Sequence, residues 1–186
     1  MQKRHTDRKL YFKELATTSR NYYIPYLEQY VAINDETSIL EVGCGEGGNL
    51  LPFAERKCQV TGVDLAGSRI QQAKEFFAEL SQKGNFFHAN FLDWIPTDTS
   101  HKYDIILIHD VIEHIGDKEI FVQRLADFLK EDGLIFWGFP AWQMPFGGHQ
   151  QIAKGLCSKI PFSHLLPKNL YRFILQISGE NPACIN

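Results

Sequence analysis

The stretch Ser38-Ile-Leu-Glu-Val-Gly-Cys-Gly-Glu-Gly47 decides the fold of this 186-residue chain. Its first five residues form a short apolar run that predicts a buried strand. The glycines that follow predict a tight turn that lets the backbone approach a ligand closely. Residues 49–56 then predict a helix whose first amide groups point at the bound molecule. Gly43, Gly45 and Gly48 match the G-x-G-x-x-G spacing of nucleotide-binding loops, which several families share.

Segments with strand patterns alternate with segments of helical periodicity from residue 38 to residue 140. Strands are expected at 38–42, 59–63, 85–91, 102–109 and 134–139, and helices at 49–56, 68–82 and 117–130. The run Ile105-Ile-Leu-Ile108 is continuously apolar, which is typical of a strand buried on both faces. The alternation predicts an α/β fold: a Rossmann-like parallel sheet with helices on both faces. Residues 10–33 are expected to be helical, divided into two pieces by Pro25.

Three acidic residues near the ends of these strands indicate what the glycine loop binds. Asp64 ends the second strand, where its carboxylate can accept hydrogen bonds from both hydroxyl groups of a ribose. Asp93 follows the third strand, where it can accept the exocyclic amine of adenine while Phe91 or Leu92 packs on the ring. Glu41 precedes Gly43 by two residues. A carboxylate there favours the ammonium group of a cationic ligand and repels the pyrophosphate of a dinucleotide.

These segments resemble the motifs of class I S-adenosylmethionine-dependent methyltransferases, in particular the type 11 and ubiquinone-biosynthesis-like small-molecule enzymes. Residues 39–47, 63–65 and 90–93 look like the first three motifs, 103–115 resemble the fourth strand with its loop, and 129–135 resemble the approach to strand five. The resemblance implies a sheet ordered 3-2-1-4-5, S-adenosylmethionine as methyl donor and S-adenosylhomocysteine as product. The family fold ends in an antiparallel β6–β7 hairpin. No strand pair is evident after Phe139, so this hairpin is expected to be absent or replaced.

The expected cofactor-binding residues lie in the glycine loop, at the ends of strands two to four and in the N-terminal helical segment. They are Glu41, Gly43, Cys44, Gly45, Gly47, Asp64, Leu65, Asn90, Phe91, Leu92, Asp93, His109, Asp110, Val111, Arg20 and Tyr22. Two alternatives stay open here: Tyr22, Tyr23 and Arg20 close over the cofactor, with Arg20 reaching its carboxylate, or the two tyrosines pack the N-terminal helix. His109 is interpreted as a cofactor-lining residue rather than a base.

The acceptor side is predicted from residues after strands four and five. The cofactor's positive sulfur already activates the methyl group, so the protein mainly aligns the nucleophile and removes its proton. His149 and His114 are the candidate catalytic residues, and Trp142, Phe146 and His149 the candidate walls of an acceptor pocket. The spacing D-x-x-E-H at 110–114 either holds a metal ion or organises its loop by hydrogen bonds. We favour the second interpretation and expect no metal.

We expect a small-molecule or lipid-like acceptor, with oxygen slightly favoured over carbon or nitrogen. Strand four is followed by His109-Asp-Val-Ile rather than the Asn/Asp-Pro-Pro-Tyr/Phe segment of nucleic-acid amino-methyltransferases. The formal net charge of −3 gives no basic field for a nucleic-acid backbone, so nucleic acid is not expected as a partner. Two other functions stay open: an NAD(P)-binding Rossmann oxidoreductase, and a non-catalytic module that binds the cofactor.

Residues 160–177 mix apolar side chains with Lys159, Lys168 and Arg172. They form either a lid helix packed on the domain or, through residues 156–177, a peripheral membrane contact. No segment approaches the roughly 20 apolar residues of a membrane span, and four cysteines without C-x-x-C spacing favour a reducing cytoplasm. We expect a single domain: an N-terminal helical cap at 1–37, a cofactor-binding core at 38–140, and a substrate-side loop and lid helix at 141–186. No feature of the sequence indicates an oligomeric state.

Overall fold

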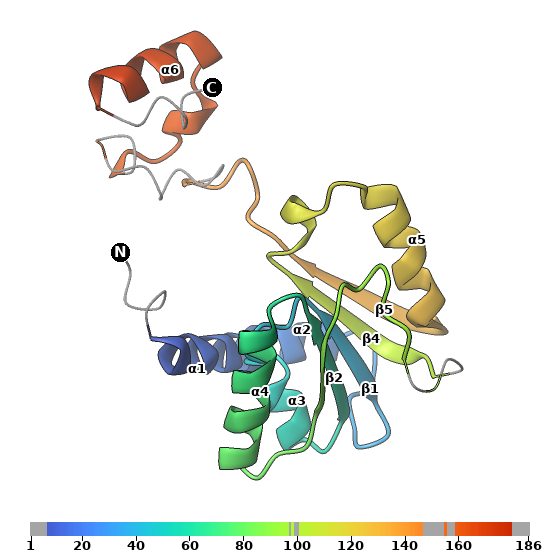
Figure 1. The fold of residues 1–186 in the computed structure, drawn as a ribbon. Helices are drawn as coiled ribbons and strands as arrows, with labels where there is room; N and C mark the ends of the chain where they lie inside the picture. Colours follow the sequence, from blue (N-terminus) through green and yellow to red (C-terminus); the bar gives the residue numbers. More distant parts are fainter. Residues whose placement is uncertain (1–6, 97, 99–100, 147–154, 156–158, 180–186) are drawn as a thin grey trace. The chain divides into compact units, whose positions relative to one another are not determined.

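The computed structural model describes residues 7–96, 98, 101–146, 155 and 159–179 (Figure 1). The chain divides into two compact units, Met1–Gly138 and Phe139–Asn186, and each is described by itself. The first unit contains the sheet and the cavities discussed below. The division into a cap, a cofactor-binding core and a lid within a single domain stays a prediction.

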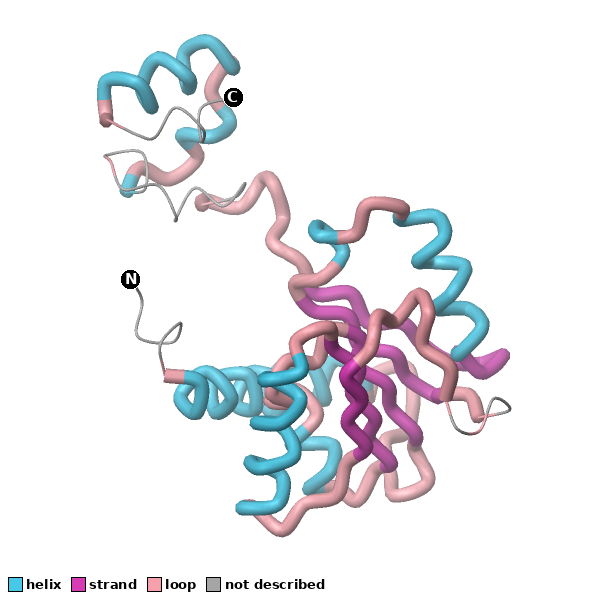
Figure 2. Tube along the Cα trace, viewed as in Figure 1, coloured by secondary structure: helices cyan, strands magenta, loops and turns pink. Residues whose placement is uncertain are grey.

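Five parallel strands form the sheet of the first unit, in the order β3-β2-β1-β4-β5 (Figure 2). The strands are β1 (Ser38–Val42), β2 (Gln59–Asp64), β3 (Asn85–His88), β4 (Tyr103–His109) and β5 (Leu129–Gly138). This order confirms the predicted one. The chain winds outward in one direction from β1 to β3 and in the other from β4 to β5. The carboxyl ends of β1 and β4 therefore form the switch point at which such sheets bind ligands.

Helices cover both faces of the sheet, as the sequence predicts. The helices α1 (Arg8–Thr18), α2 (Ile24–Leu27), α3 (Leu51–Glu55) and α4 (Gly67–Glu79) share one core cluster, and α5 (Lys118–Phe128) belongs to the other. Alternate side chains of β4 pack into the two core clusters. Ile105 and Leu107 belong to the first cluster, and Ile106 and Ile108 belong to the second. Because both faces of β4 are buried, its sequence is continuously apolar rather than alternating.

The N-terminal helical segment is continuous rather than divided at Pro25. A π-helical turn, Ser19–Tyr23, follows α1 directly and leads into α2. The amide of Ile24 donates to the carbonyl of Ser19, five residues earlier. Pro25 has no amide hydrogen, and its ring would clash with the carbonyl four residues before it, so a wider turn relieves both problems. The prediction of two separate pieces was wrong, because the proline widens the helix by one residue without ending it.

Strand β5 begins earlier than the sequence predicts. The expected helix 117–130 ends at Phe128, and residues 131–133, which lie between that helix and the expected strand 134–139, belong to the strand. Leu129 pairs with Tyr103 of β4, and pairing resumes when Leu134 meets Ile105, so the register shifts between these positions. The acidic, glycine-containing signal at 131–133 therefore marks an irregularity within β5 rather than a loop before it.

The second unit contains a 3₁₀ turn (Ser163–Leu165) and the helix α6 (Lys168–Ile177). The predicted helical pattern at 160–177 is therefore a helix only over its last part. No strand occurs among the described residues after Gly138, and β5 pairs with β4 alone at the edge of the sheet. Within the described ranges, the structure has no helix of the length and apolarity needed to cross a membrane.

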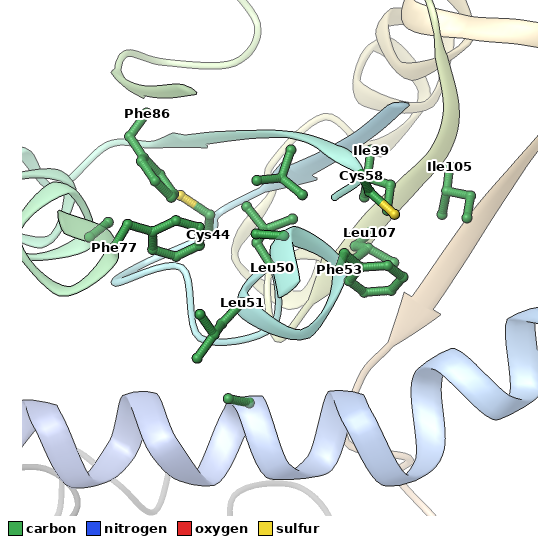
Figure 3. Packing of buried hydrophobic residues seen from close by; sticks show 14 of the residues in the cluster. Ile39, Cys44, Leu50, Leu51, Phe53, Cys58, Phe77, Phe86, Ile105 and Leu107 are labelled. Carbon is green, nitrogen blue, oxygen red and sulfur yellow. The ribbon is translucent and has the colours of Figure 1, made fainter. Parts of the chain in front are cut away.

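The glycine loop packs onto the sheet through Cys44, which lies among the buried side chains of the first core cluster (Figure 3). A Cβ atom at Gly62 of β2 would lie 2.6 Å from the Cys44 sulfur and 2.9 Å from Cδ1 of Phe86. These separations are shorter than any packing contact, and both neighbours are buried side chains. Only glycine at position 62 leaves room for the loop to lie against β2.

We therefore expect Gly62→Ala to lower the free energy of unfolding by about 1–3 kcal/mol through overpacking. Gly116→Ala is the matched control, because a Cβ there would meet no atom within 4 Å. That variant should stay within about 0.5 kcal/mol of the wild type. Urea unfolding of the three proteins measures the difference. Equal stabilities for the two variants would contradict the packing described for Cys44.

Candidate functional site

Two cavities open at the carboxyl ends of the strands, and Asp110 lines both of them. The smaller, of about 240 Å³, is bounded by the glycine loop and by the segments that follow β2, β3 and β4. The larger, of about 790 Å³, is bounded by α1, by Tyr23 of the π turn and by His109 at the end of β4. A ligand that occupies both cavities therefore passes Asp110.

Asp64 ties the glycine loop to the beginning of α4. One of its carboxylate oxygens accepts a hydrogen bond from the amide of Gly45 at 2.8 Å, and the other accepts one from the amide of Ala66 at 2.7 Å. Asp64 and Leu65 line the smaller cavity. Because each carboxylate oxygen can accept more than one hydrogen bond, Asp64 keeps capacity for ligand hydroxyl groups.

Glu41 is a carboxyl group inside the protein, only 1% exposed, and it lines neither cavity. Its Oε1 atom accepts a hydrogen bond from Asn49 Nδ2 at 2.8 Å, while Oε2 has no hydrogen-bond partner among the described residues. Burial raises the pKa of Glu41 to about 8, against the opposing effect of the Asn49 hydrogen bond and with the help of the negative charge of Asp64. A buried carboxylate of this kind favours a nearby positive charge.

Two contacts hold the glycine loop to the N-terminal helix. Ser19 Oγ donates to the carbonyl of Asn49 at 2.8 Å, so the π turn is linked through Asn49 to Glu41. Arg8 Nε donates to Glu46 Oε1 at 2.5 Å, and the Glu46 side chain is fully buried within the loop. The sequence analysis did not identify these four supporting residues. Each pair is separated by 30 or more positions, and no local pattern connects its members.

The other loop residues predicted to bind the cofactor determine the conformation and packing of the turn. Gly43 has a φ of +72°, and a Cβ there would lie 2.3 Å from Cγ2 of Val111, so the loop after β4 packs directly on it. Gly43 and Val111 line the smaller cavity, whereas Cys44, Gly45 and Gly47 do not. Burial raises the pKa of the Cys44 thiol well above its usual value, so this sulfur is no ready nucleophile.

The segment after β3 contributes three of its four predicted residues to the smaller cavity. Asn90, Phe91 and Leu92 line it. Asp93 does not: it is exposed, and its carboxylate accepts a hydrogen bond from Asn90 Nδ2 at 2.7 Å. Arg69, in the first turn of α4, lines the same cavity although the sequence analysis did not select it. Its place soon after Asp64, in the helix that follows β2, was the available signal.

Asp110 has an unusual backbone conformation for a residue other than glycine, with a φ of +53°. Its amide donates to the carbonyl of Gly138 at 2.9 Å, which holds this conformation against β5. The Asp110 carboxylate is half exposed, and its Oδ2 lies 3.8 Å from Nδ1 of His109. Such left-handed residues cost free energy and gather at functional sites, where the surrounding structure maintains them.

The structure does not bring Arg20 and Tyr22 to either cavity. Arg20 pairs with Glu55 of α3 at 2.6 Å, and Tyr22 is 69% exposed. Tyr23 lines the larger cavity instead, with its ring centroid 5.9 Å from that of His109 and 4.7 Å from that of Phe136. Burial raises the pKa of Tyr23 to about 12, and the negative charges of Asp110 and Glu41 add to this effect.

His114 lies in a 3₁₀ turn after β4 and lines the smaller cavity. Glu113 beside it has a buried Oε2 atom without a hydrogen-bond partner in the part of the chain that the structure describes. Within that part, no three His, Cys, Asp or Glu side chains lie close enough together to hold a metal ion. The spacing at 110–114 thus does not form a three-ligand group there. His149, a candidate for catalysis and for the acceptor pocket, lies outside the described residues.

Trp142 and Phe146, the other predicted acceptor residues, belong to the second unit. Trp142 is exposed, and its carbonyl oxygen lies 2.5 Å from Nε2 of His164. The two rings also meet edge to face, with their centroids 5.3 Å apart. His164 is buried and joins the Trp142 loop to the 3₁₀ turn before α6, a role that the sequence analysis missed.

Comparisons with known proteins agree with this arrangement. Residues 40–135, from β1 into β5, match the family model of a methyltransferase domain. The chain is 33% identical over 135 residues to (S)-coclaurine N-methyltransferase of Thalictrum flavum subsp. glaucum, which covers 68% of this chain and 36% of that protein. It is 31% identical over 127 residues to ubiquinone biosynthesis O-methyltransferase of Bartonella quintana (strain Toulouse), which covers 66% of this chain and 51% of that protein.

A solved structure, PKMT2 from Rickettsia typhi in complex with AdoHcy, superposes with a TM-score of 0.54 and 27% sequence identity. The match covers 63% of this chain and 24% of that one. The chain spans 36% and 51% of the length of the two curated relatives named above. Since the family model extends over more than half of the chain and over the sheet that carries both cavities, the chain belongs to the methyltransferase-domain family.

Proposed function

We propose that this chain binds S-adenosylmethionine and transfers its methyl group to a small-molecule or lipid-like acceptor, with oxygen favoured as the accepting atom. The observation that carries the proposal is the pair of cavities that meet at Asp110, close to the buried carboxyl group of Glu41. The two relatives named above bear the names of an N- and an O-methyltransferase. The preference for oxygen therefore rests on the motifs of the sequence.

The residues around the smaller cavity fit the nucleoside part of this cofactor. Asp64 has a carboxylate for the ribose hydroxyl groups, and Asn90, Phe91 and Leu92 offer an amide and two apolar side chains for adenine. Asp93, whose carboxylate accepts a hydrogen bond from Asn90, keeps its proposed role as acceptor of the adenine amine. Asp110, which lines both cavities, would then lie beside the amino-acid part of the cofactor. When bound, the cofactor supplies a methyl group activated by a positive sulfur.

The electrostatics of the site favour a cationic ligand over a dinucleotide. Asp64 and Asp110 place negative charge at this end of the sheet: Asp64 raises the pKa of the Cys44 thiol, and Asp110 raises that of the Tyr23 phenol. The sulfonium and ammonium groups of S-adenosylmethionine are attracted by this field. The pyrophosphate of NAD is repelled by it, which counts against the oxidoreductase alternative.

His114 is the residue that we propose to accept the proton of the acceptor. It lines the smaller cavity, as Asp110 does, and an imidazole can take a proton from a hydroxyl group or an ammonium group. Trp142, Phe146 and His149 keep their proposed role as walls of the acceptor pocket. The exposed apolar residues Leu170, Phe173 and Ile177 of α6 support a lid, or a membrane contact, for an apolar acceptor. The free, buried Cys44 and Cys58 support a reducing cytoplasm.

The direct test of the proposal is a calorimetric titration with S-adenosylhomocysteine and, separately, with NAD. We expect micromolar binding of S-adenosylhomocysteine and no saturable binding of NAD. Micromolar binding of NAD without binding of S-adenosylhomocysteine would sink the proposal. Incubation with labelled S-adenosylmethionine and a metabolite or lipid extract then separates an enzyme from a non-catalytic module, because only the enzyme labels an acceptor.

Replacing Glu41 with Gln tests the buried charge without removing the group that accepts from Asn49. Folding raises the pKa of Glu41 from its ordinary 4.5 to about 8, so the wild type loses stability as the pH rises through this window. We expect Glu41→Gln to differ little from the wild type near pH 5 and to be roughly 2–4 kcal/mol more stable at pH 8. Urea unfolding of the ligand-free proteins across this range measures the difference.

The same variant should bind S-adenosylhomocysteine roughly 3- to 10-fold more weakly at pH 8, because the ligand's ammonium group loses a nearby negative charge. Gain of stability together with loss of affinity is the signature of a charge kept for a ligand. A stability difference that does not grow with pH would show that the Glu41 carboxyl is not held neutral by burial.

His114→Gln tests the proposed proton acceptor. With an acceptor found by the labelling experiment, we expect kcat to fall about 100-fold while the affinity for S-adenosylhomocysteine stays within twofold. His101→Gln is the control, because His101 precedes β4 and lies at the opposite end of this strand. An unchanged kcat in His114→Gln would remove this residue from the mechanism.

A further inference from the structure

The π turn Ser19–Tyr23 presents two neighbouring tyrosines to different surroundings. Tyr22 is exposed, whereas Tyr23 is half-buried and lines the larger cavity together with His109 and Asp110. Both stand in the same helical segment, and the sequence analysis selected Tyr22 as the cofactor-binding residue. In the structure it is Tyr23 that lines the cavity, because the π turn ahead of Pro25 adds a residue to the helical turn and so changes the direction of the side chains that follow.

Both ends of the turn are fixed to the site. At its beginning, the fully buried Ser19 donates to the carbonyl of Asn49, which in turn holds Glu41. At its end, the Tyr23 ring packs between His109 of β4 and Phe136 of β5, at centroid distances of 5.9 and 4.7 Å. The position of the Tyr23 ring is therefore set by contacts with the central strands rather than by α1 alone.

The Tyr23 ring lines the larger cavity together with Asp110, the residue that also lines the smaller one. A ligand that extended from the smaller cavity into the larger one would pass beside Asp110, because Asp110 lines both. In the proposed cofactor, the atom that follows the ribose carbons is the sulfonium sulfur. Tyr23 shares the larger cavity with the carboxylate of Asp110, so an aromatic ring and a negative charge border the same space.

We infer that the Tyr23 ring recognises the positive charge of the sulfonium group, and that the π turn is the device that positions it. An aromatic face attracts a cation through its quadrupole, and the attraction grows when water is excluded. The environment suits a cation: the negative charges of Asp110 and Glu41 both contribute to the raised pKa of the Tyr23 phenol. This inference rests on the proposed function and adds to it a residue that distinguishes the charged substrate cofactor from its neutral product.

The test compares the affinities for S-adenosylmethionine and S-adenosylhomocysteine, which differ at sulfur in the methyl group and its positive charge. In Tyr23→Leu, we expect the affinity for S-adenosylmethionine to fall roughly 3- to 30-fold and that for S-adenosylhomocysteine to fall less than twofold. Calorimetry on the full chain gives both dissociation constants without any acceptor. Tyr22→Leu, the change at the adjacent exposed ring, should alter neither affinity.

Tyr23→Phe keeps the ring and its packing against His109 and Phe136, and guards against a variant that fails to fold. We expect it to bind both ligands within twofold of the wild type. Equal losses for both ligands in Tyr23→Leu, or the same selective loss in Tyr22→Leu or Tyr23→Phe, would overturn the inference. A wild type that binds neither ligand would refute the proposed function instead, so the two failures are distinguishable.

Discussion

The site depends on one carboxyl group that the fold keeps out of water. Glu41 lies in the central strand β1, and only Asn49 donates a hydrogen bond to it among the described residues. Burying such a group costs free energy unless a proton or a nearby cation neutralises it. In the protein without a ligand a proton neutralises the carboxyl group, because burial raises the pKa of Glu41 to about 8. A cationic ligand can take over this role, so the buried carboxyl group contributes to the affinity for that ligand.

Several contacts within the first unit hold the segments around this carboxyl group in place. Asn49, which donates to Glu41, accepts at its own carbonyl from Ser19 of the π turn. Asp64 holds the glycine loop from β2, and Gly62 beneath it leaves the space that the Cys44 sulfur requires. These contacts fix the loop from the sheet on one side and from the N-terminal helix on the other. The cavities at the strand ends are therefore bounded by segments that are rigidly connected to one another.

The residue patterns predicted a parallel sheet and most element positions, because buried parallel strands leave continuous apolar runs and glycine loops leave a fixed spacing. The order of the strands was implied by the family resemblance. The sequence did not predict the π turn or the irregular start of β5, since both depend on how distant segments meet. The same limit applies to the site. Asp64 and Asn90 were found from their place after strands, whereas choosing Tyr23 over Tyr22 needed the rotation that the π turn introduces. Supporting pairs such as Arg8 and Glu46 left no local pattern at all.

The central claim is that a neutral Glu41 becomes ionised when a cationic ligand arrives, and a count of protons tests it most directly. Titrating the protein at pH 7 with S-adenosylmethionine, which carries a net positive charge, in two buffers of different ionisation enthalpy gives the number of protons exchanged on binding. The account predicts a net release of between about one third and one proton, since a pKa of about 8 leaves Glu41 largely protonated before binding. Binding with no proton release, or with proton uptake, would contradict it.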